Sequence, residues 1–164
     1  MIKRLIIVLL IAVPAIIFAQ GGEPKKSIDW INLEKAKKYA KKYNKNILIY
    51  FYKKDCPYCE EMNKETLQDK IVINLINQNF FPVKINSRTK DTIIYQNKKY
   101  SNQQPIQQGS SWPHDFYREV AKMKNEQTTT PTIVLFNNDF EKITSFPGKQ
   151  SKQLLLRRIN KYIK

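Results

Sequence analysis

The order of apolar runs along this 164-residue chain predicts a single α/β domain with a mixed sheet flanked by helices. In the first half, helix-like and strand-like runs alternate, as expected for neighbouring parallel strands. In the second half, two strand-like runs are separated only by a short polar segment, as expected for an antiparallel hairpin. The chain's two cysteines form a Cys-x-x-C between a predicted strand and the helix after it. A Cys-x-x-C in that setting is typical of a redox-active pair.

The N-terminal half supplies the first elements. Asn32 is a suitable N-cap for a helix over about 33–44, which has its apolar residues on one face. Residues 47–52 are continuously apolar and aromatic, which predicts a buried strand. The helix that begins at the Cys-x-x-C is expected to break near Asp69 and to resume over 71–76.

The middle of the chain alternates short apolar runs with polar turns. We expect a strand over 80–85, a hairpin of 92–95 with 99–100 around a turn at 96–98, a polar loop over 101–113, and a short helix over 114–124.

The C-terminal part predicts a hairpin and a helix. Residues 132–136 and 142–146 are strand-like, and Asn137-Asn138-Asp139 between them is a turn signal. Pro147-Gly148 ends the second strand, and Ser151 is a suitable N-cap for the final helix.

The N-terminus predicts export from the cytoplasm. Lys3 and Arg4 precede an uncharged apolar stretch from Leu5 to Ala19. That stretch contains Pro14 and falls short of the about 20 apolar residues that a membrane-spanning helix needs. We therefore expect a signal peptide over 1–19, cleaved near Ala19, rather than a permanent membrane span.

The mature protein would then work in the periplasm or be secreted, where disulfides persist. No cysteine follows the apolar stretch, so a lipid anchor is not expected. We expect a lead-in segment over 20–29 and one domain over 30–164.

The chain is strongly basic, with a net charge of +15 at pH 7. Such a charge is compatible with nucleic acid or an anionic surface as a partner. However, Lys, Asn and Ile have AT-rich codons and make up 59 of the 164 residues, and the lysines are dispersed. We therefore interpret the charge as compositional bias and expect no nucleic-acid partner.

The Cys-x-x-C predicts thiol–disulfide exchange. Pro57 suits the first position of a helix, which makes Cys56 the N-cap and turns its sulfur toward unpaired N–H groups. These groups and the helix dipole favour the thiolate, so the pKa of Cys56 should lie below the free value of about 8.5. Lys53 and Lys54 would add to this effect, whereas Glu60 and Glu61 would oppose it. We expect Cys56 to attack and the more buried Cys59 to resolve the mixed disulfide.

Other uses of the two cysteines fit poorly. A structural zinc site takes four N or S ligands, and the chain offers only two cysteines and one histidine. Covalent haem needs Cys-x-x-C-His, but Glu60 occupies the histidine position. We expect no metal and no cofactor beyond a redox-active Cys56–Cys59 disulfide.

Three motifs together resemble the thioredoxin superfamily: Cys56-Pro57-Tyr58-Cys59 after a strand, Thr130-Pro131-Thr132 opening a strand, and Phe146-Pro147-Gly148 before the last helix. The chain is also similar to secreted, periplasmic thioredoxin-related proteins of the Bacteroidota, in Trp30 before a Lys-rich helix and in Val83-Lys84-Ile85-Asn86. The resemblance implies a thioredoxin fold with a hairpin-containing insertion, about 88–127, on the edge of the fold before the strand that follows Pro131.

The resemblance also implies the substrate site. Pro131 would be cis and face the Cys-x-x-C, and the Thr130 backbone would pair with an extended substrate segment. Pro57 and Tyr58, between the cysteines, would line the same site. Without the resemblance, Pro131 is an ordinary proline at the start of a strand.

The chain departs from the thioredoxin pattern at two positions. Tyr50 stands where thioredoxin has a buried acid beneath the second cysteine, which puts proton relay to Cys59 in doubt. Asp55 stands where a tryptophan commonly precedes the first cysteine, and its charge would raise the pKa of Cys56. Pro-Tyr is the glutaredoxin dipeptide, but no Gly-Gly follows the last hairpin, so glutathione dependence is not expected.

Two features of the insertion have alternative interpretations. His114, the only histidine, is either a base near the thiols or a structural residue at a helix start. Five aromatic residues form either a substrate-facing ledge or the core of the insertion, namely Tyr95, Tyr100, Trp112, Phe116 and Tyr117.

Together these features predict a periplasmic thiol–disulfide oxidoreductase that exchanges disulfides with cysteine-containing exported proteins. An upstream redox partner in the membrane or periplasm would maintain its redox state. The alternative is a non-catalytic binding module whose cysteines stay locked as a disulfide while the fold docks extended segments of an envelope partner.

Overall fold

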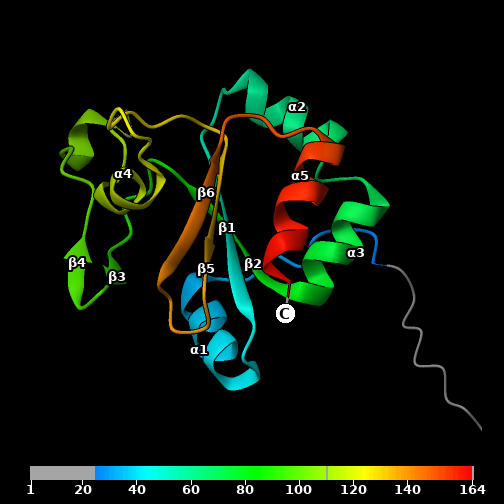
Figure 1. The fold of residues 1–164 in the computed structure, drawn as a ribbon. Helices are drawn as coiled ribbons and strands as arrows, with labels where there is room; N and C mark the ends of the chain where they lie inside the picture. Colours follow the sequence, from blue (N-terminus) through cyan, green and yellow to red (C-terminus); the bar gives the residue numbers. More distant parts are fainter. Residues whose placement is uncertain (1–24, 110, 164) are drawn as a thin grey trace, which may run out of the picture.

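A four-stranded mixed sheet in the order β2-β1-β5-β6 organises the fold (Figure 1). The structure is a computed structural model that describes residues 25–109 and 111–163; the predicted signal peptide, 1–19, lies outside them. Strand β1 pairs parallel with β2 and antiparallel with β5, and β5 pairs antiparallel with β6. This arrangement confirms the predicted α/β class. The strands are β1 (Asn46–Tyr52), β2 (Phe80–Asn86), β5 (Thr132–Phe136) and β6 (Lys142–Pro147).

Helices cover both faces of the sheet. One face carries α1 (Leu33–Tyr43), α4 (Asp115–Ala121) and a separate hairpin of β3 (Ile93–Tyr95) and β4 (Lys98–Tyr100). The other carries α3 (Lys70–Asn79) and α5 (Lys152–Ile159), while α2 (Pro57–Glu65) lies across the end of the sheet. Two 3-10 turns complete the fold, Ile106–Gln108 and Asn160–Tyr162.

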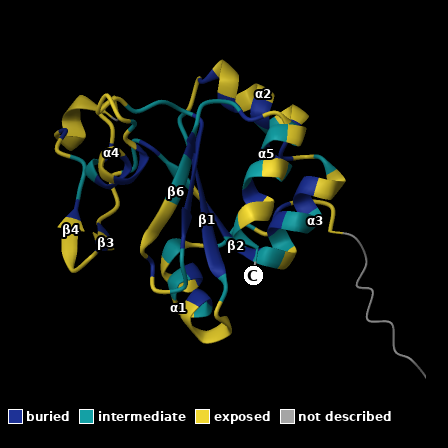
Figure 2. Cartoon of the chain, in the orientation of Figure 1, coloured by how far each residue is buried: buried dark blue, intermediate teal, exposed yellow. Residues whose placement is uncertain are grey.

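The central strand β1 explains why the sheet needs helices on both sides. Ile47, Ile49 and Phe51 point into the core on the α1 and α4 side. Leu48 and Tyr50 point into the core on the α3 and α5 side. Successive side chains of a strand face opposite ways, so a continuous apolar run must be covered twice. Figure 2 shows β1 buried along its length.

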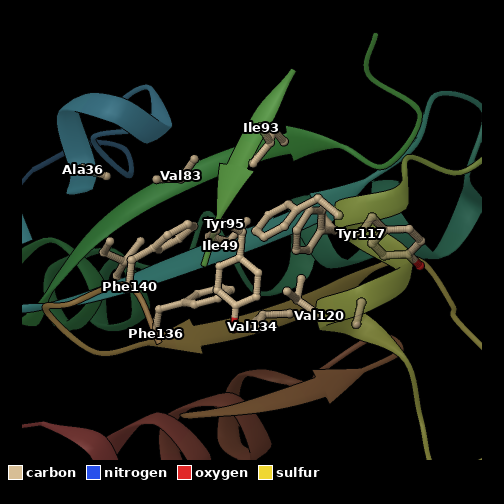
Figure 3. Close-up of a cluster of buried hydrophobic side chains, with 14 of the residues drawn as sticks. Ala36, Ile49, Val83, Ile93, Tyr95, Tyr117, Val120, Val134, Phe136 and Phe140 are labelled. Atoms are coloured by element: carbon tan, nitrogen blue, oxygen red, sulfur yellow. The ribbon is translucent and has the colours of Figure 1, made fainter. Parts of the chain in front are cut away.

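The core on the α1 and α4 side is aromatic and includes the predicted insertion (Figure 3). The Tyr95 ring lies 5.4 Å from that of Phe116, and the rings of Phe136 and Phe140 lie 4.7 Å apart. The core-packing interpretation is therefore confirmed for Tyr95, Phe116 and the buried Tyr100 and Tyr117. It is wrong for Trp112, which is 51% exposed.

Side-chain caps fix three helix starts where the sequence places them. The Asn32 side chain accepts from the Lys35 N–H at 2.7 Å, and that of Asp69 accepts from Ile71 at 2.9 Å. Ser151 accepts from Leu154 at 3.4 Å. These bonds satisfy N–H groups that lack partners within the helix.

Two predicted boundaries in the insertion need correction. Helix α4 ends at Ala121 rather than Lys124, because Lys122 adopts an extended backbone. The β3–β4 turn has two residues rather than three. Gln96 and Asn97 both have positive φ, 49° and 60°, as a two-residue hairpin turn requires, so Lys98 already belongs to β4.

Candidate active site

Strand register brings three distant segments to one end of the sheet, where β1 and β2 finish and β5 begins. Tyr52, which ends β1, pairs with Asn86, which ends the parallel β2. Phe51 pairs with Thr132, the first residue of the antiparallel β5. The segments that follow β1 and β2 and precede β5 therefore meet. They enclose a pocket of about 400 Å³ lined by Lys53, residues 56–58, Ser87, Arg88, Pro113, Tyr117 and residues 128–130.

Cys56 occupies the N-cap of α2, as predicted. Its backbone is extended, Pro57 is the first helical residue, and the Cys59 N–H donates to Cys56 Sγ at 3.3 Å. The two sulfurs are joined in a disulfide. The sulfur of Cys56 thus receives a backbone N–H at the positive end of the α2 dipole, which favours negative charge on it after reduction.

Access to the pocket distinguishes the two cysteines better than burial does. Cys56 is 3% exposed and Cys59 is 2% exposed, so the expected difference in burial is very small. However, Cys56 lines the pocket and Cys59 does not. Between them, Pro57 and Tyr58 line the pocket, and Tyr58 is 63% exposed. A partner that enters the pocket therefore meets Cys56 first.

Thr130 lies directly against Cys56. The Thr130 carbonyl oxygen is 3.6 Å from Cys56 Sγ, and its Oγ1 is 3.7 Å away. The Thr130–Pro131 peptide bond is cis, as the resemblance implied. Pro131 itself is buried and does not line the pocket. Its carbonyl accepts from the Gly148 N–H at 2.8 Å, which ties the segment to the end of β6.

Hydroxyl groups hold the Thr130 segment in place. The Tyr117 and Thr132 hydroxyls both donate to the Thr129 carbonyl at 2.6 Å. These bonds satisfy a carbonyl one residue from the Cys56 contact and join the segment to α4. The buried Tyr117 side chain of α4 therefore supports one wall of the pocket.

No carboxylate lies where thioredoxin has its buried acid, because Tyr50 fills that position. Tyr50 is fully buried, and its hydroxyl donates to the Cys59 carbonyl at 3.4 Å. Burial and the neighbouring Tyr52 raise the pKa of Tyr50 well above its usual value. The hydroxyl stays protonated at neutral pH, so it cannot act as the base that activates Cys59. Asp55, the other departure, is exposed and has a φ of 53°.

His114 is structural rather than a base near the thiols. Its ring is 1% exposed; Nδ1 accepts from the Phe116 N–H at 3.0 Å, and Nε2 lies 2.9 Å from the Asp91 carbonyl. The neutral ring with its proton on Nε2 satisfies both contacts. Protonation of Nδ1 would break the cap of α4, and burial lowers the pKa of His114.

This environment predicts a loss of stability in acid. Because the pKa of His114 is lower in the folded protein, the unfolded chain takes up the proton first as the pH falls. The neutral ring therefore contributes stability above the unfolded pKa of about 6.5, and this contribution is lost as the pH falls toward the folded pKa. Urea denaturation between pH 8 and 5 should show a shallower pH dependence for His114→Asn, which keeps a capping side chain. Equal slopes for the two proteins would contradict the assignment.

Several pocket residues are not among those that we predicted from the sequence. Ser87 and Arg88 directly follow the second strand, and the carboxyl ends of parallel neighbours meet at one sheet edge. That rule would have identified both. Thr128 and Thr129 reach the site only through the connection of α4 to β5, which no local pattern signals. Tyr117, named above as part of a possible substrate-facing ledge, is buried in the core and also lines the pocket.

Within 25–109 and 111–163, no three His, Cys, Asp or Glu side chains are grouped so that they could hold a metal ion. No helix within the same ranges has the length and hydropathy to cross a membrane.

Comparison with known proteins assigns the family. A model of the thioredoxin-like domain matches residues 33–163, nearly all of the predicted domain. The chain belongs to the thioredoxin-like domain family. This membership, with the Cys56–Cys59 disulfide, supports thiol–disulfide oxidoreductase activity. No curated protein sequence matches the chain.

Solved structures share the thioredoxin fold. A thioredoxin from Thermus thermophilus is 20% identical, with 83% of this chain and 87% of that one covered and a TM-score of 0.58. The oxidoreductase DsbH is 15% identical over 84% and 85% of the two chains, with a TM-score of 0.57. A disulphide isomerase from Xylella fastidiosa Temecula1 is 20% identical over 79% and 86%, with a TM-score of 0.52. The similarity to the Bacteroidota proteins stays a prediction.

Proposed function

We propose that this thioredoxin-like protein is a periplasmic or secreted thiol–disulfide oxidoreductase that exchanges disulfides with cysteines of exported proteins. One observation carries the proposal: Cys56, at the N-terminus of α2, lines a pocket in which its sulfur lies 3.6 Å from the Thr130 carbonyl. A nucleophile beside a backbone segment that lines the same pocket suits an extended polypeptide substrate.

In the proposed reaction, Cys56 of the reduced protein attacks one sulfur of a substrate disulfide as a thiolate. The substrate disulfide breaks, one substrate sulfur leaves as a thiolate, and the other is joined to Cys56. The Cys59 thiolate then attacks Cys56 Sγ and releases the second substrate sulfur. Two electrons pass from the protein to the substrate, and the Cys56–Cys59 disulfide forms. The reverse sequence oxidises a substrate dithiol.

The other proposed site residues bind the substrate. The Thr130 backbone pairs with an extended segment next to the substrate cysteine, and Pro57 and Tyr58 form the surface on which that segment lies. Pro131 acts through Thr130, because it is buried behind the pocket wall. The exposed ring of Tyr58 supports this role, since an aromatic residue 63% exposed beside a nucleophile can be covered by a partner.

The proposed location and partners rest on the N-terminal sequence. Lys3, Arg4 and the apolar stretch to Ala19 favour export, and exported proteins are those whose disulfides persist. An exported oxidoreductase needs a source or sink of electrons outside the cytoplasm, so we propose an upstream redox partner in the membrane or periplasm.

Insulin reduction by dithiothreitol tests the proposal against a binding module with a permanent disulfide. The wild type should accelerate precipitation of the insulin B chain, and Cys56→Ser should show only the uncatalysed rate. Lys38→Gln, at an exposed position of α1 outside the pocket, is the control for nonspecific effects of substitution. A wild type that does not accelerate the reaction, with cysteines that dithiothreitol leaves oxidised, would favour the binding module.

A further inference from the structure

The pocket in front of Cys56 is positively charged. Lys53 and Arg88 line it together with neutral Ser, Thr, Tyr and Pro side chains. None of the described residues that line it carries a carboxylate. The charge therefore belongs to the pocket itself and not only to the basic surface of the chain.

The fold brings these two cations to the same pocket. Lys53 follows Tyr52 at the end of β1, and Arg88 comes two residues after Asn86 at the end of β2. Tyr52 and Asn86 are register partners. Both cations therefore project from adjacent strand ends, on the side of the sheet edge where Cys56 lies.

Neither side chain forms an ion pair within the described part of the chain. The Lys53 ammonium has no ion pair or hydrogen bond there. Arg88 is held through its backbone: its N–H donates to Asn86 Oδ1 at 3.0 Å, and its carbonyl accepts from Asn102 Nδ2 at 3.5 Å. By contrast, Lys149 near the other end of α2 is paired with Glu61 and Glu65.

Half-buried cations without a partner favour a ligand that supplies an anion. Both Lys53 and Arg88 have intermediate exposure, so water screens them less than it screens the exposed lysines. Complementary charge at an interface mainly sets selectivity and the rate of association. A substrate with an acidic side chain beside its reacting sulfur would therefore be selected over others and would associate faster.

We propose that this pocket selects disulfide-bearing protein segments with Asp or Glu within one or two residues of the reacting cysteine. Lys53 and Arg88 are the residues that determine this specificity. The inference rests on the proposed oxidoreductase function and adds the class of substrate.

Three model peptides test the selectivity. They share one length and one internal disulfide and differ only in the residues flanking the cysteine, which are Glu, Gln or Lys. For the wild type at low ionic strength, kcat/KM should fall in the order Glu, Gln, Lys, with about a tenfold range. In 0.5 M salt the range should shrink to about twofold, because the Debye length falls to a few ångströms.

A matched pair of variants locates the effect. Lys53→Gln/Arg88→Gln should reduce the Glu-to-Lys ratio of kcat/KM to about two. Lys38→Gln/Arg157→Gln removes the same number of positive charges from exposed positions outside the pocket and should keep the wild-type ratio. Equal losses in both double variants would mean that net charge alone causes the preference and would overturn the inference. If the pocket variant does not fold, the ranking of the three peptides by the wild type and its salt dependence still test the preference for acidic segments.

A small anionic disulfide is the other source of the same chemistry. Oxidised glutathione is a small disulfide that carries carboxylates. Cystamine, a small disulfide with ammonium groups and no carboxylate, is its cationic control. Faster turnover of oxidised glutathione than of the Glu peptide would overturn a preference for protein segments. Equal kcat/KM for the three peptides, with insulin still reduced, would refute only the substrate class. Failure to reduce both insulin and the peptides would refute the proposed function itself.

Discussion

Replacing Cys59 with serine should turn the protein into a trap that keeps its substrates joined to Cys56 as mixed disulfides. Cys56 keeps the N-cap of α2 and its place in the pocket, so it can still attack. The serine cannot supply the second thiolate, and release stops. Turnover of insulin should fall below about 1% of the wild-type rate. Non-reducing gels of the variant incubated with oxidised substrate should show adducts that dithiothreitol reverses.

Alkylation of the reduced protein compares the reactivity of the Cys56 and Cys59 thiols without a substrate. A thiol with the free pKa of about 8.5 is only about 3% thiolate at pH 7, whereas one lowered to about 7 is half ionised. Cys56 should therefore react with iodoacetamide about tenfold faster than Cys59. For the trapping experiment, Cys56→Ser is the matched control and should form no mixed-disulfide adducts with the substrate. Faster labelling of Cys59, or trapping by Cys56→Ser rather than Cys59→Ser, would reverse the assignment.

Replacing Phe116 with alanine should destabilise the protein by about 3–5 kcal/mol, the usual cost of removing a fully buried phenylalanine. The ring is completely buried and lies 5.4 Å from Tyr95, 6.0 Å from Phe51 and 6.2 Å from Phe136. Removal leaves a cavity between α4 and the sheet that these rigid rings cannot fill. The loss should appear as a lower midpoint in urea with little change in slope.

Trp112→Ala is the control for this substitution. Trp112 belongs to the same predicted insertion and is also a large aromatic residue, but it is 51% exposed. Its removal should change the free energy of unfolding by less than about 1 kcal/mol. A small effect of Phe116→Ala would mean that the insertion packs loosely on the sheet. Because Tyr95, Tyr100 and Phe116 are part of the core, a design that shortens the insertion should keep them.

Local chemistry explains why much of the fold could be predicted. Asn32, Asp69 and Ser151 begin helices because their side chains accept from backbone N–H groups two or three residues later, and this needs no tertiary contact. The apolar run of β1 predicts a strand covered on both faces for the same local reason. The errors lie in the insertion, where α4 ends early and Trp112 is exposed, because packing rather than local pattern sets those features.

By itself, the sequence determined the α/β class, the placement of Cys56 at a helix N-terminus, and the absence of an acid at position 50. Each depends on residue type and spacing within one element or one junction. The resemblance implied that the Thr130–Pro131 segment faces the cysteines, but only the tertiary structure decided how residues from distant segments surround the sulfur. Thr130, 74 positions away, comes within 3.6 Å of Cys56 because β5 runs antiparallel to β1. Arg88 joins Lys53 because β2 runs parallel to β1. Strand pairing between distant segments sets these contacts, and its register follows from burying both faces of the sheet at once.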